Sequence, residues 1–173
     1  GDPIMSIART TISGSQTING GTYSGNSSSD GGAFYVSLRS AATVNFDTVN
    51  ILNNHSDAAG GGICIIFGTS ETKAVNIYSS QINSNSASTK GGGISMLADS
   101  ASSSNYFTLT IVDSIIHNNT VTASSDADGG GIYANRSMSY STVVRLILET
   151  VSVEGNSCGD SGGGIYSSNT HVI

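Results

Sequence analysis

Apolar and polar residues alternate with a period of two through most of the chain, which is the pattern of half-buried β-strands. Four successive segments show it, and their apolar members are Val44, Phe46, Val49 and Ile51; Val75, Ile77 and Ile82; Phe107, Leu109, Ile111 and Ile116; and Leu146, Leu148, Val151 and Val153. Each segment lies between two glycine runs, and a further short strand is expected directly after each run. The pattern predicts two or three short strands per unit and no helix.

The glycine runs themselves recur. Each is followed by an apolar anchor, and the five anchors are Phe34, Ile63, Ile94, Ile132 and Ile165, at intervals of 29, 31, 38 and 33 residues. A second mark keeps the same phase, because an asparagine with an apolar or aromatic residue three positions before it precedes each run. These asparagines are Asn26, Asn54, Asn85, Asn119 and Asn156. Two signals in one phase indicate a repeat protein rather than a glycine-rich linker.

A unit of about 33 residues with short strands and no helix predicts one turn of a parallel β-helix. The whole chain, residues 1–173, is therefore expected to form a single all-β domain, a right-handed parallel β-helix of about five coils. Stacked coils would align the anchors into one buried column. The glycines would form sharp corners, where the backbone needs positive φ. The asparagines tolerate left-handed backbone and would form a hydrogen-bonded ladder along the stack.

Two segments are expected to vary between coils, because insertions in a solenoid face solvent. The stretch 120–131 is longer than its counterpart after Asn54 and is expected to bulge outward. The stretch 97–105 is rich in Ser and Ala. Such insertions often form the loops by which one repeat protein differs from another in binding.

Charge and composition exclude several classes of partner. The chain has a net charge of −6 with six basic residues in all, and these are scattered, so nucleic acid and anionic membrane surfaces are not expected partners. No apolar stretch is long enough for a membrane helix, and the first residues do not open a signal peptide. Cys64 and Cys158 occupy different places in different repeats, which makes a disulfide between them doubtful.

Some β-helix proteins cleave polysaccharides with clustered carboxylates, so such a cluster would indicate an active site. Asp47 and Glu149 align when the repeats are superposed, but three turns separate them. His55 and Asp57 form a compact pair beside Asn54, whereas His117 and His171 lack metal-ligand spacing. No catalytic, cofactor or metal residue is therefore assigned. Weak calcium binding remains an alternative, because acidic residues precede several glycine runs; they are Asp30, Asp126, Asp128 and Asp160.

Five asparagines are glycosylation candidates because they begin acceptor sequons or, for the last, a rare variant; they are Asn118, Asn135, Asn26, Asn54 and Asn156. The last three are also ladder positions and cannot carry sugar if they point inward. Asn118 and Asn135 lie off the ladder. The sequons are meaningful only in a eukaryotic host.

The two paired marks resemble the repeats of polymorphic membrane proteins and related right-handed β-helix surface proteins. The glycine mark reads GGAF once and GGGI four times, and the asparagine mark reads YSGN, ILNN, INSN, IHNN and VEGN. The resemblance covers residues 18 to 170 and implies an extracellular or cell-surface location and a structural or adhesive function. It differs in that Tyr, Ile or Val replaces phenylalanine in the second mark. A polysaccharide lyase or hydrolase of the β-helix class is the alternative, and ice binding is a third reading that irregular Thr positions disfavour.

Two features indicate partners. Alternation places Tyr35, Cys64, Ser95, Tyr133 and Tyr166 opposite the buried anchors, where the tyrosines could contact an outer loop, another subunit or carbohydrate. At the two termini, residues around Ile4, Ile7 and Ile12 and the last three residues form incomplete turns. These turns would be completed either by end-to-end stacking into a filament or by further repeats of a longer chain.

The anchor column leads to a first prediction. Ile132→Asp is expected to cost several kcal/mol of folding free energy, because an unpaired charge would enter the apolar column. Thermal or urea unfolding followed by circular dichroism measures the loss. A variant that melts like the parent chain would contradict the β-helix assignment.

Overall fold

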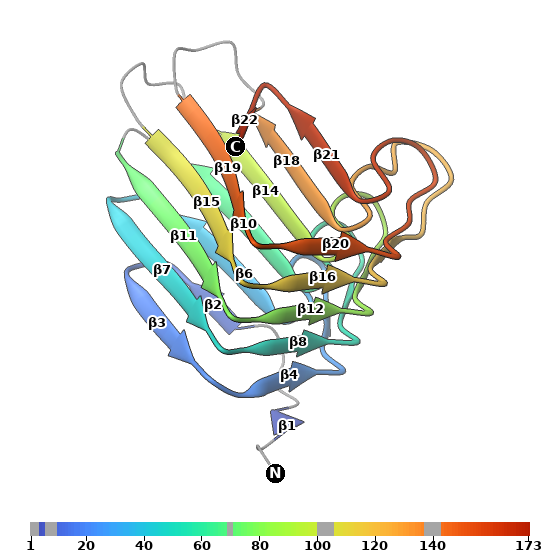
Figure 1. The fold of residues 1–173 in the computed structure, drawn as a ribbon, viewed down its shortest axis with the longest axis horizontal. Coiled ribbons are helices and arrows are strands. Elements are labelled where there is room, and N and C mark those ends of the chain that lie inside the picture. The colour runs from blue at the N-terminus through green and yellow to red at the C-terminus, as the bar shows by residue number, and fades with distance from the viewer. Residues whose placement is uncertain (1–3, 6–9, 69–70, 100–105, 137–142) are drawn as a thin grey trace.

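The computed structural model describes residues 4–5, 10–68, 71–99, 106–136 and 143–173, and every strand pairing in it is parallel. The described chain contains strands and turns but no helix. Figure 1 shows the strands stacked in columns that run from the N-terminal end to the C-terminal end of the molecule. The chain thus forms the predicted right-handed parallel β-helix.

Four sheets run along the coil, three of six strands and one of four. The anchor sheet, which carries the five anchors, contains β2 (Thr10–Ile12), β6 (Phe34–Leu38), β10 (Ile63–Gly68), β14 (Ile94–Asp99), β18 (Ile132–Arg136) and β21 (Ile165–Ser168). The long sheet contains β3 (Gln16–Asn19), β7 (Ala42–Asp47), β11 (Lys73–Tyr78), β15 (Tyr106–Val112), β19 (Val143–Glu149) and β22 (His171–Val172).

The other two sheets are built from short strands. The short sheet contains β1 (Ile4–Met5), β4 (Thr22–Ser24), β8 (Asn50–Leu52), β12 (Gln81–Asn83), β16 (Ile115–His117) and β20 (Ser152–Glu154). The corner sheet contains β5 (Ser27–Ser28), β9 (His55–Ser56), β13 (Ser86–Ala87) and β17 (Thr120–Val121). These two-residue strands raise the number per coil to four, whereas the alternation predicted two or three.

The predicted column of anchors is confirmed by the strand register. Ile63 pairs with Phe34 on one side and Ile94 on the other, and Ile132 continues the column to Ile165. The first four anchors are at most 1 % exposed, whereas Ile165 in the last coil is half-buried. Side chains of the long and short sheets, such as Phe46 and Ile82, fill the rest of the same continuous core.

The asparagine ladder also forms, with one correction. Asn54 donates its backbone N–H to Asn85 Oδ1 at 3.0 Å and its Nδ2 to the same oxygen at 2.9 Å, and this pattern repeats from coil to coil. The ladder asparagines do not themselves adopt left-handed backbone. The residue before each one does, as in Asn53 and Asn118. The ladder side chain is thereby turned inward, where backbone and side-chain donors both reach it.

The glycine runs are required for two physical reasons. The first glycine of each run is left-handed, as at Gly60 with a φ of +68°. The second lies against the neighbouring coil, because a Cβ added at Gly61 would stand 2.2 Å from the carbonyl oxygen of Gly92. Real Cβ atoms never approach an oxygen so closely. The runs therefore set how tightly the coils stack at this corner.

The first of the two expected variable segments forms an outward loop, and the second lies partly outside the described residues. The loop after β17 reaches outward beyond those of the preceding coils, as Figure 1 shows at the right of the view. It nevertheless returns Ala127 and Asp128 to buried positions before the next glycine run. In the second segment, Leu97 to Asp99 belong to β14, and residues 100–105 lie outside the described residues.

One inward-facing residue contradicts the apolar pattern. Lys73 pairs with Ala42 and Phe107 in the core column of the long sheet and is 1 % exposed. Its Nζ lies 5.0 Å from the centroid of the Phe107 ring and donates to the carbonyl of Glu71 at 2.8 Å. Burial lowers the pKa of Lys73 from 10.5, and the nearby Glu71 charge offsets part of this effect.

The close approach at the glycine corner generates a prediction. Gly61→Ala is expected to destabilise the fold by several kcal/mol, because the backbone of the next coil, at Ser86 and Gly92, must move to admit the methyl group. Gly14→Ala is the matched control, since nothing lies within 4 Å of a Cβ there. Urea unfolding of both variants measures the difference, and equal midpoints would contradict the packing described.

The buried lysine gives a prediction with a defined pH dependence. Because the pKa of Lys73 is lowered in the folded state, the unfolded chain binds more protons between that pKa and 10.5. Its contribution to stability therefore rises with pH in that window. Lys73→Met is expected to melt higher than the parent at pH 7, and the gap should narrow as pH rises toward 10.5. A melting-temperature gap that does not change with pH would contradict this account.

Candidate functional site

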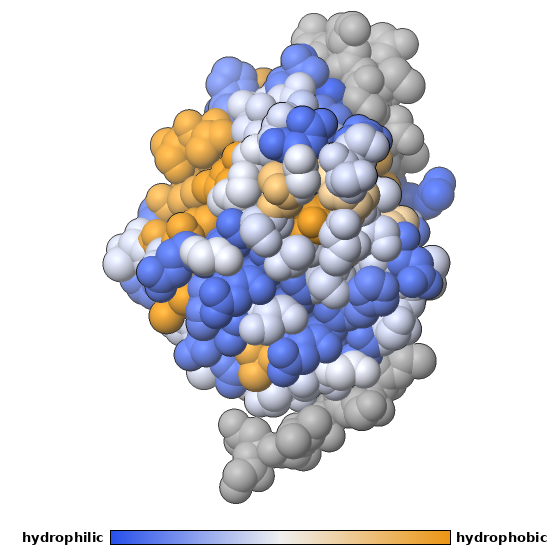
Figure 2. Space-filling view, turned by 90° about the vertical axis from the view of Figure 1, so that its right-hand side faces the viewer, coloured by the Kyte–Doolittle hydropathy of each residue, from blue (hydrophilic) through white to orange (hydrophobic). Residues whose placement is uncertain are grey.

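A row of outward polar side chains lies along the corner sheet. The residue after each ladder asparagine points outward there, and the resulting row is Ser27, His55, Ser86, Thr120 and Ser157. Two positions further on, a second outward row contains Ser29, Asp57, Ser88 and Thr122. These nine residues are called the corner surface. Figure 2 faces the side of the coil that carries the corner loops and shows mainly hydrophilic residues over it.

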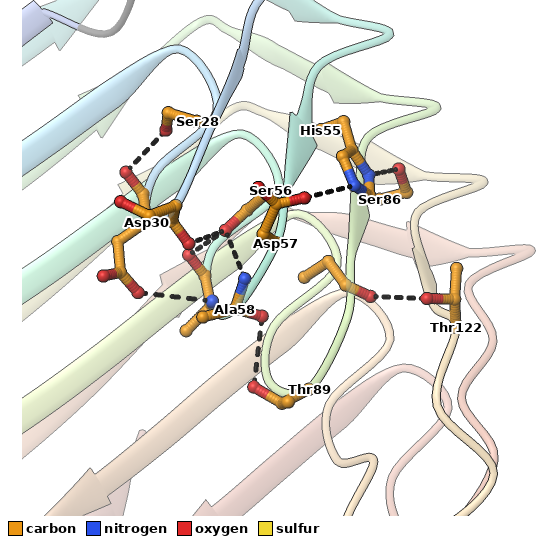
Figure 3. Close-up of polar contacts among 12 residues, drawn as sticks. Ser28, Asp30, His55, Ser56, Asp57, Ala58, Ser86, Thr89 and Thr122 are labelled. Atoms are coloured by element: carbon orange, nitrogen blue, oxygen red, sulfur yellow. Dashed lines mark hydrogen bonds and ion pairs between the residues drawn. The ribbon is translucent and has the colours of Figure 1, made fainter.

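The corner surface holds one linked group of three side chains, drawn in Figure 3. His55 Nδ1 lies 2.8 Å from Ser86 Oγ, on the adjacent strand. His55 Nε2 lies 3.3 Å from Asp57 Oδ1, two residues further along its own chain segment. The sequence predicted the contact between His55 and Asp57. It missed Ser86, which alignment of the residues after Asn54 and Asn85 would have found.

A serine, a histidine and an aspartate in contact invite comparison with nucleophilic sites. Acyl transfer also needs free backbone donors to stabilise an oxyanion. The N–H of Ser86 instead donates to the Asn54 carbonyl at 2.9 Å, and that of Ser88 to the Ser56 carbonyl at 3.0 Å. The Asp57 side chain is 75 % exposed and is therefore well solvated. The N–H groups of Ser86 and Ser88 are thus both engaged in the backbone of the coil.

Beneath this surface, hydroxyl groups stabilise the corner itself. Ser56 is fully buried, and its Oγ donates to the carbonyls of Ser29 and Ala59, both at 3.0 Å. Ser28 occupies the same place one coil earlier and donates to the carbonyls of Asp30 and Gly31. Figure 3 shows these bonds joining the short strands to the loops that follow them. The loops are thus held in place by local hydrogen bonds.

An ion-pair cluster holds the outer loop of the fourth repeat. Lys90 Nζ lies 2.6 Å from both Asp126 Oδ1 and Asp128 Oδ2. Burial alone would lower the pKa of Lys90, but the hydrogen bonds and charges of the two aspartates outweigh it and raise that pKa from 10.5 to about 12. Two of the four acidic residues that suggested calcium thus contact an ammonium group. Asp30 Oδ1 accepts from the Ala59 N–H at 3.4 Å, and Asp160 remains exposed.

The outward column of the anchor sheet is more buried than alternation implies. Cys64 and Ser95 are 2 % and 3 % exposed, and Tyr133 is 8 % exposed. Lys90 lies over the Tyr133 ring at 5.4 Å, and the Tyr166 ring stacks on it with centroids 5.3 Å apart. Burial raises the pKa of Tyr133, although a hydrogen bond from Asn135 opposes this shift. Lysine and tyrosine neighbours within the chain therefore cover this column in the later coils.

The other candidate catalytic or metal-binding residues, two carboxylates and two histidines, do not come together in the structure. Asp47 and Glu149 share one column of the long sheet, with Tyr78 and Val112 between them. Three strand spacings amount to about 14 Å, too far for two carboxylates to act on one glycosidic bond. His117 contacts Asn118 at 3.3 Å, and His171 is exposed in β22. Among the described residues, no three His, Cys, Asp or Glu side chains form a group that could hold a metal.

Two further sequence expectations concern the cysteines and the membrane. Neither Cys64 nor Cys158 forms a disulfide, and the first is buried and the second half-buried. The doubt about a disulfide between them is thus confirmed. In the described part of the chain, no helix has the length and apolar character needed to cross a membrane.

The glycosylation candidates differ in access. Asn26 and Asn54 are 6 % and 1 % exposed, and Asn54 Nδ2 donates to two acceptors. Asn156 is half-buried with Nδ2 bonded to the Ile116 carbonyl, and Asn135 Nδ2 donates to Tyr133 Oη. A glycan replaces a hydrogen of Nδ2, so these nitrogens are engaged in the fold. Asn118 is the exposed member of the five.

Comparison with known families identifies one stretch of the chain. Residues 150–168 match the model of the Chlamydia polymorphic membrane protein (Chlamydia_PMP) repeat. They span β20, the ladder residue Asn156, the last glycine run and the whole of β21. This stretch is similar to a polymorphic membrane protein repeat. The resemblance drawn from the two marks is thereby confirmed over this stretch, and the parallel β-helix agrees with it. No significant match was found among curated proteins or among solved structures.

Proposed function

We propose that the protein is an extracellular adhesive surface protein, in which the β-helix is a rigid support and the corner surface contacts the partner. The observation that carries the proposal is the corner surface itself. Outward hydroxyl, imidazole and carboxylate groups recur there at the coil spacing of about 4.8 Å, on a backbone fixed by the ladder beneath. The polymorphic membrane protein repeat suggests a cell-surface location.

The chemistry of the corner surface suits a carbohydrate or another polar cell-surface ligand. His55, Asp57 and Ser86 offer donors and acceptors on two adjacent strands, and Thr120 and Ser157 extend the row with oxygens 3.1 Å apart. Each contact is individually weak. Several contacts at a regular spacing on a rigid surface add up, because little conformational entropy is lost on binding.

A binding role fits these residues better than a polysaccharide-cleaving role. The two aligned carboxylates, Asp47 and Glu149, are three strands apart. Lys90 neutralises the closest pair of acidic corner residues, Asp126 and Asp128. A calorimetric titration with calcium tests the remaining possibility of a cation at the corner.

The proposal predicts that binding depends on the corner surface. Beads coated with the intact chain are applied to cultured animal cells and to a printed glycan array. The triple variant His55→Ala, Asp57→Ala and Ser86→Ala is expected to lose at least tenfold in binding, because the linked polar group is removed. The parent chain is expected to bind in at least one of the two assays, to the cells or to the glycan array.

The matched control changes the opposite side of the coil. Thr43→Ala with Thr108→Ala alters outward residues of the long sheet and is expected to bind like the parent. Thermal melts establish that all three proteins are folded. A parent chain that binds neither cells nor glycans, or a triple variant that binds as well as the control, would overturn the adhesive assignment of the corner surface.

A further inference from the structure

Two threonine hydroxyls on the corner side of the coil donate their hydrogens to the backbone. Thr122 Oγ1 donates to the carbonyl of Ala87, 3.4 Å away in the preceding coil. Thr89, in the loop after β13, donates in the same way to the carbonyl of Ala58 at 3.1 Å. Figure 3 shows both bonds. A hydroxyl has one hydrogen and two lone pairs, so these two hydroxyls offer only lone pairs to a ligand.

The linked group on the corner surface orients a third hydroxyl in the same sense. A carboxylate only accepts hydrogen bonds, so the hydrogen of the neutral His55 ring is assigned to Nε2, 3.3 Å from Asp57 Oδ1. His55 Nδ1 then carries a lone pair. Ser86 therefore donates its hydroxyl hydrogen to Nδ1 across 2.8 Å. With that hydrogen engaged, Ser86 Oγ presents lone pairs to a ligand, as Asp57 does.

The surroundings of this group have the same bias toward acceptors. Thr120 and Ser157 use one of their two hydroxyl hydrogens on each other, across 3.1 Å. The side chains of Asp57 and of Asp126, in the outer loop, are 75 % and 85 % exposed and add carboxylate oxygens. The ammonium group of Lys90 is bound to Asp126 at 2.6 Å. While His55 is neutral, the corner surface therefore presents more acceptors than donors, and its exposed charge is negative.

We propose that the corner surface, while His55 is neutral, binds uncharged sugars through their hydroxyl hydrogens, and that protonation of His55 shifts its preference to acidic sugars. A free sugar hydroxyl donates a hydrogen bond, whereas a sulfate or a carboxylate only accepts. The inference rests on the adhesive function proposed above and names the ligand class of that surface.

Protonation of His55 reverses the bond to Ser86. The imidazolium ring donates from both nitrogens, so Nδ1–H then donates to Ser86 Oγ. The hydroxyl hydrogen of Ser86 is released and becomes a donor for the ligand. The ring also gains a positive charge beside Asp57. Histidine is the side chain whose charge ordinarily changes between pH 5 and 8, so this reversal falls in that window.

The neighbouring strands leave His55 with one charged contact. β5 and β13 pair with β9 on its two sides and carry only serine and alanine. The loops after them carry Asp30 and Lys90, which bond to the Ala59 N–H and to the aspartates of the outer loop. Among the described residues, Asp57 is thus the charged side chain in contact with the ring. Titration of His55 is therefore expressed at Asp57 and Ser86.

Nuclear magnetic resonance of the nitrogen-labelled intact chain tests the hydrogen positions without a ligand. At pH 8, His55 is expected in a single tautomer with its hydrogen on Nε2. His171, an exposed histidine of β22, is the internal reference and is expected to average two tautomers. A His55 ring protonated at Nδ1 at this pH, or averaged like His171, would overturn the inference.

A printed array tests the ligand class. It carries each oligosaccharide in three forms, with free hydroxyls, with O-methylated hydroxyls and with sulfated hydroxyls. At pH 8, the parent chain is expected to bind the free form about tenfold better than the other two, because O-methylation keeps the oxygens and removes the donors. At pH 5, the sulfated form is expected to gain about tenfold on the free form.

Two variants separate the role of His55 from general effects of pH. His55→Gln has no titrating ring and is expected to show the same preference at pH 5 and pH 8. His117→Gln, in the short sheet, is the matched control and is expected to follow the parent chain. Thermal melts at both pH values establish that the variants are folded.

The outcomes distinguish this inference from the adhesive function on which it rests. Stronger binding of the sulfated form at pH 8, or a folded His55→Gln chain that changes preference as the parent does, would overturn the inference and leave adhesion in place. Binding to cells but to no glycan would do the same. A parent chain that binds neither cells nor glycans would overturn the adhesive function and the ligand class together.

Discussion

The interaction on which the structure depends is the hydrogen bond between asparagines in successive coils. One Oδ1 accepts both the backbone N–H and the side-chain Nδ2 of its neighbour, within 3.0 Å in each case. These groups lie in the interior, where an unpaired amide would be costly. The ladder therefore fixes the distance and the rotation between coils at one corner. The glycine run that follows can approach its neighbours closely only because that corner is held in register.

The repeating marks of the fold are readable from the sequence because each has one physical cause. The anchors such as Ile94 recur because they share one apolar column, and the second glycine of each run recurs because no Cβ fits between the coils. The ladder asparagines recur because a shorter or apolar side chain could not bridge two backbones. Such constraints act identically in every coil, so they leave a period in the sequence.

Features specific to one coil leave no period and could not be predicted. Lys73 occupies an inward position because the ring of Phe107 and the Glu71 carbonyl accommodate it there, which alternation alone cannot indicate. The corner strands are only two residues long, too short for a period to show. In the linked group on the corner surface, too, one contact could be predicted from the sequence and the other could not. The contact of His55 with Asp57 is local in sequence and was predicted, whereas Ser86 joins it across the coil and was not.

Hydrogen exchange of the asparagine side chains tests the account most directly. Nuclear magnetic resonance can follow the Nδ2 protons of Asn54, Asn85 and Asn119, each of which bonds a carbonyl one coil back and an Oδ1 one coil forward. Asn53, an exposed asparagine beside the ladder, serves as the internal reference. Exchange slower by several orders of magnitude at the three ladder positions is predicted. Exchange as fast as that of Asn53 would show that the ladder does not hold the coils together.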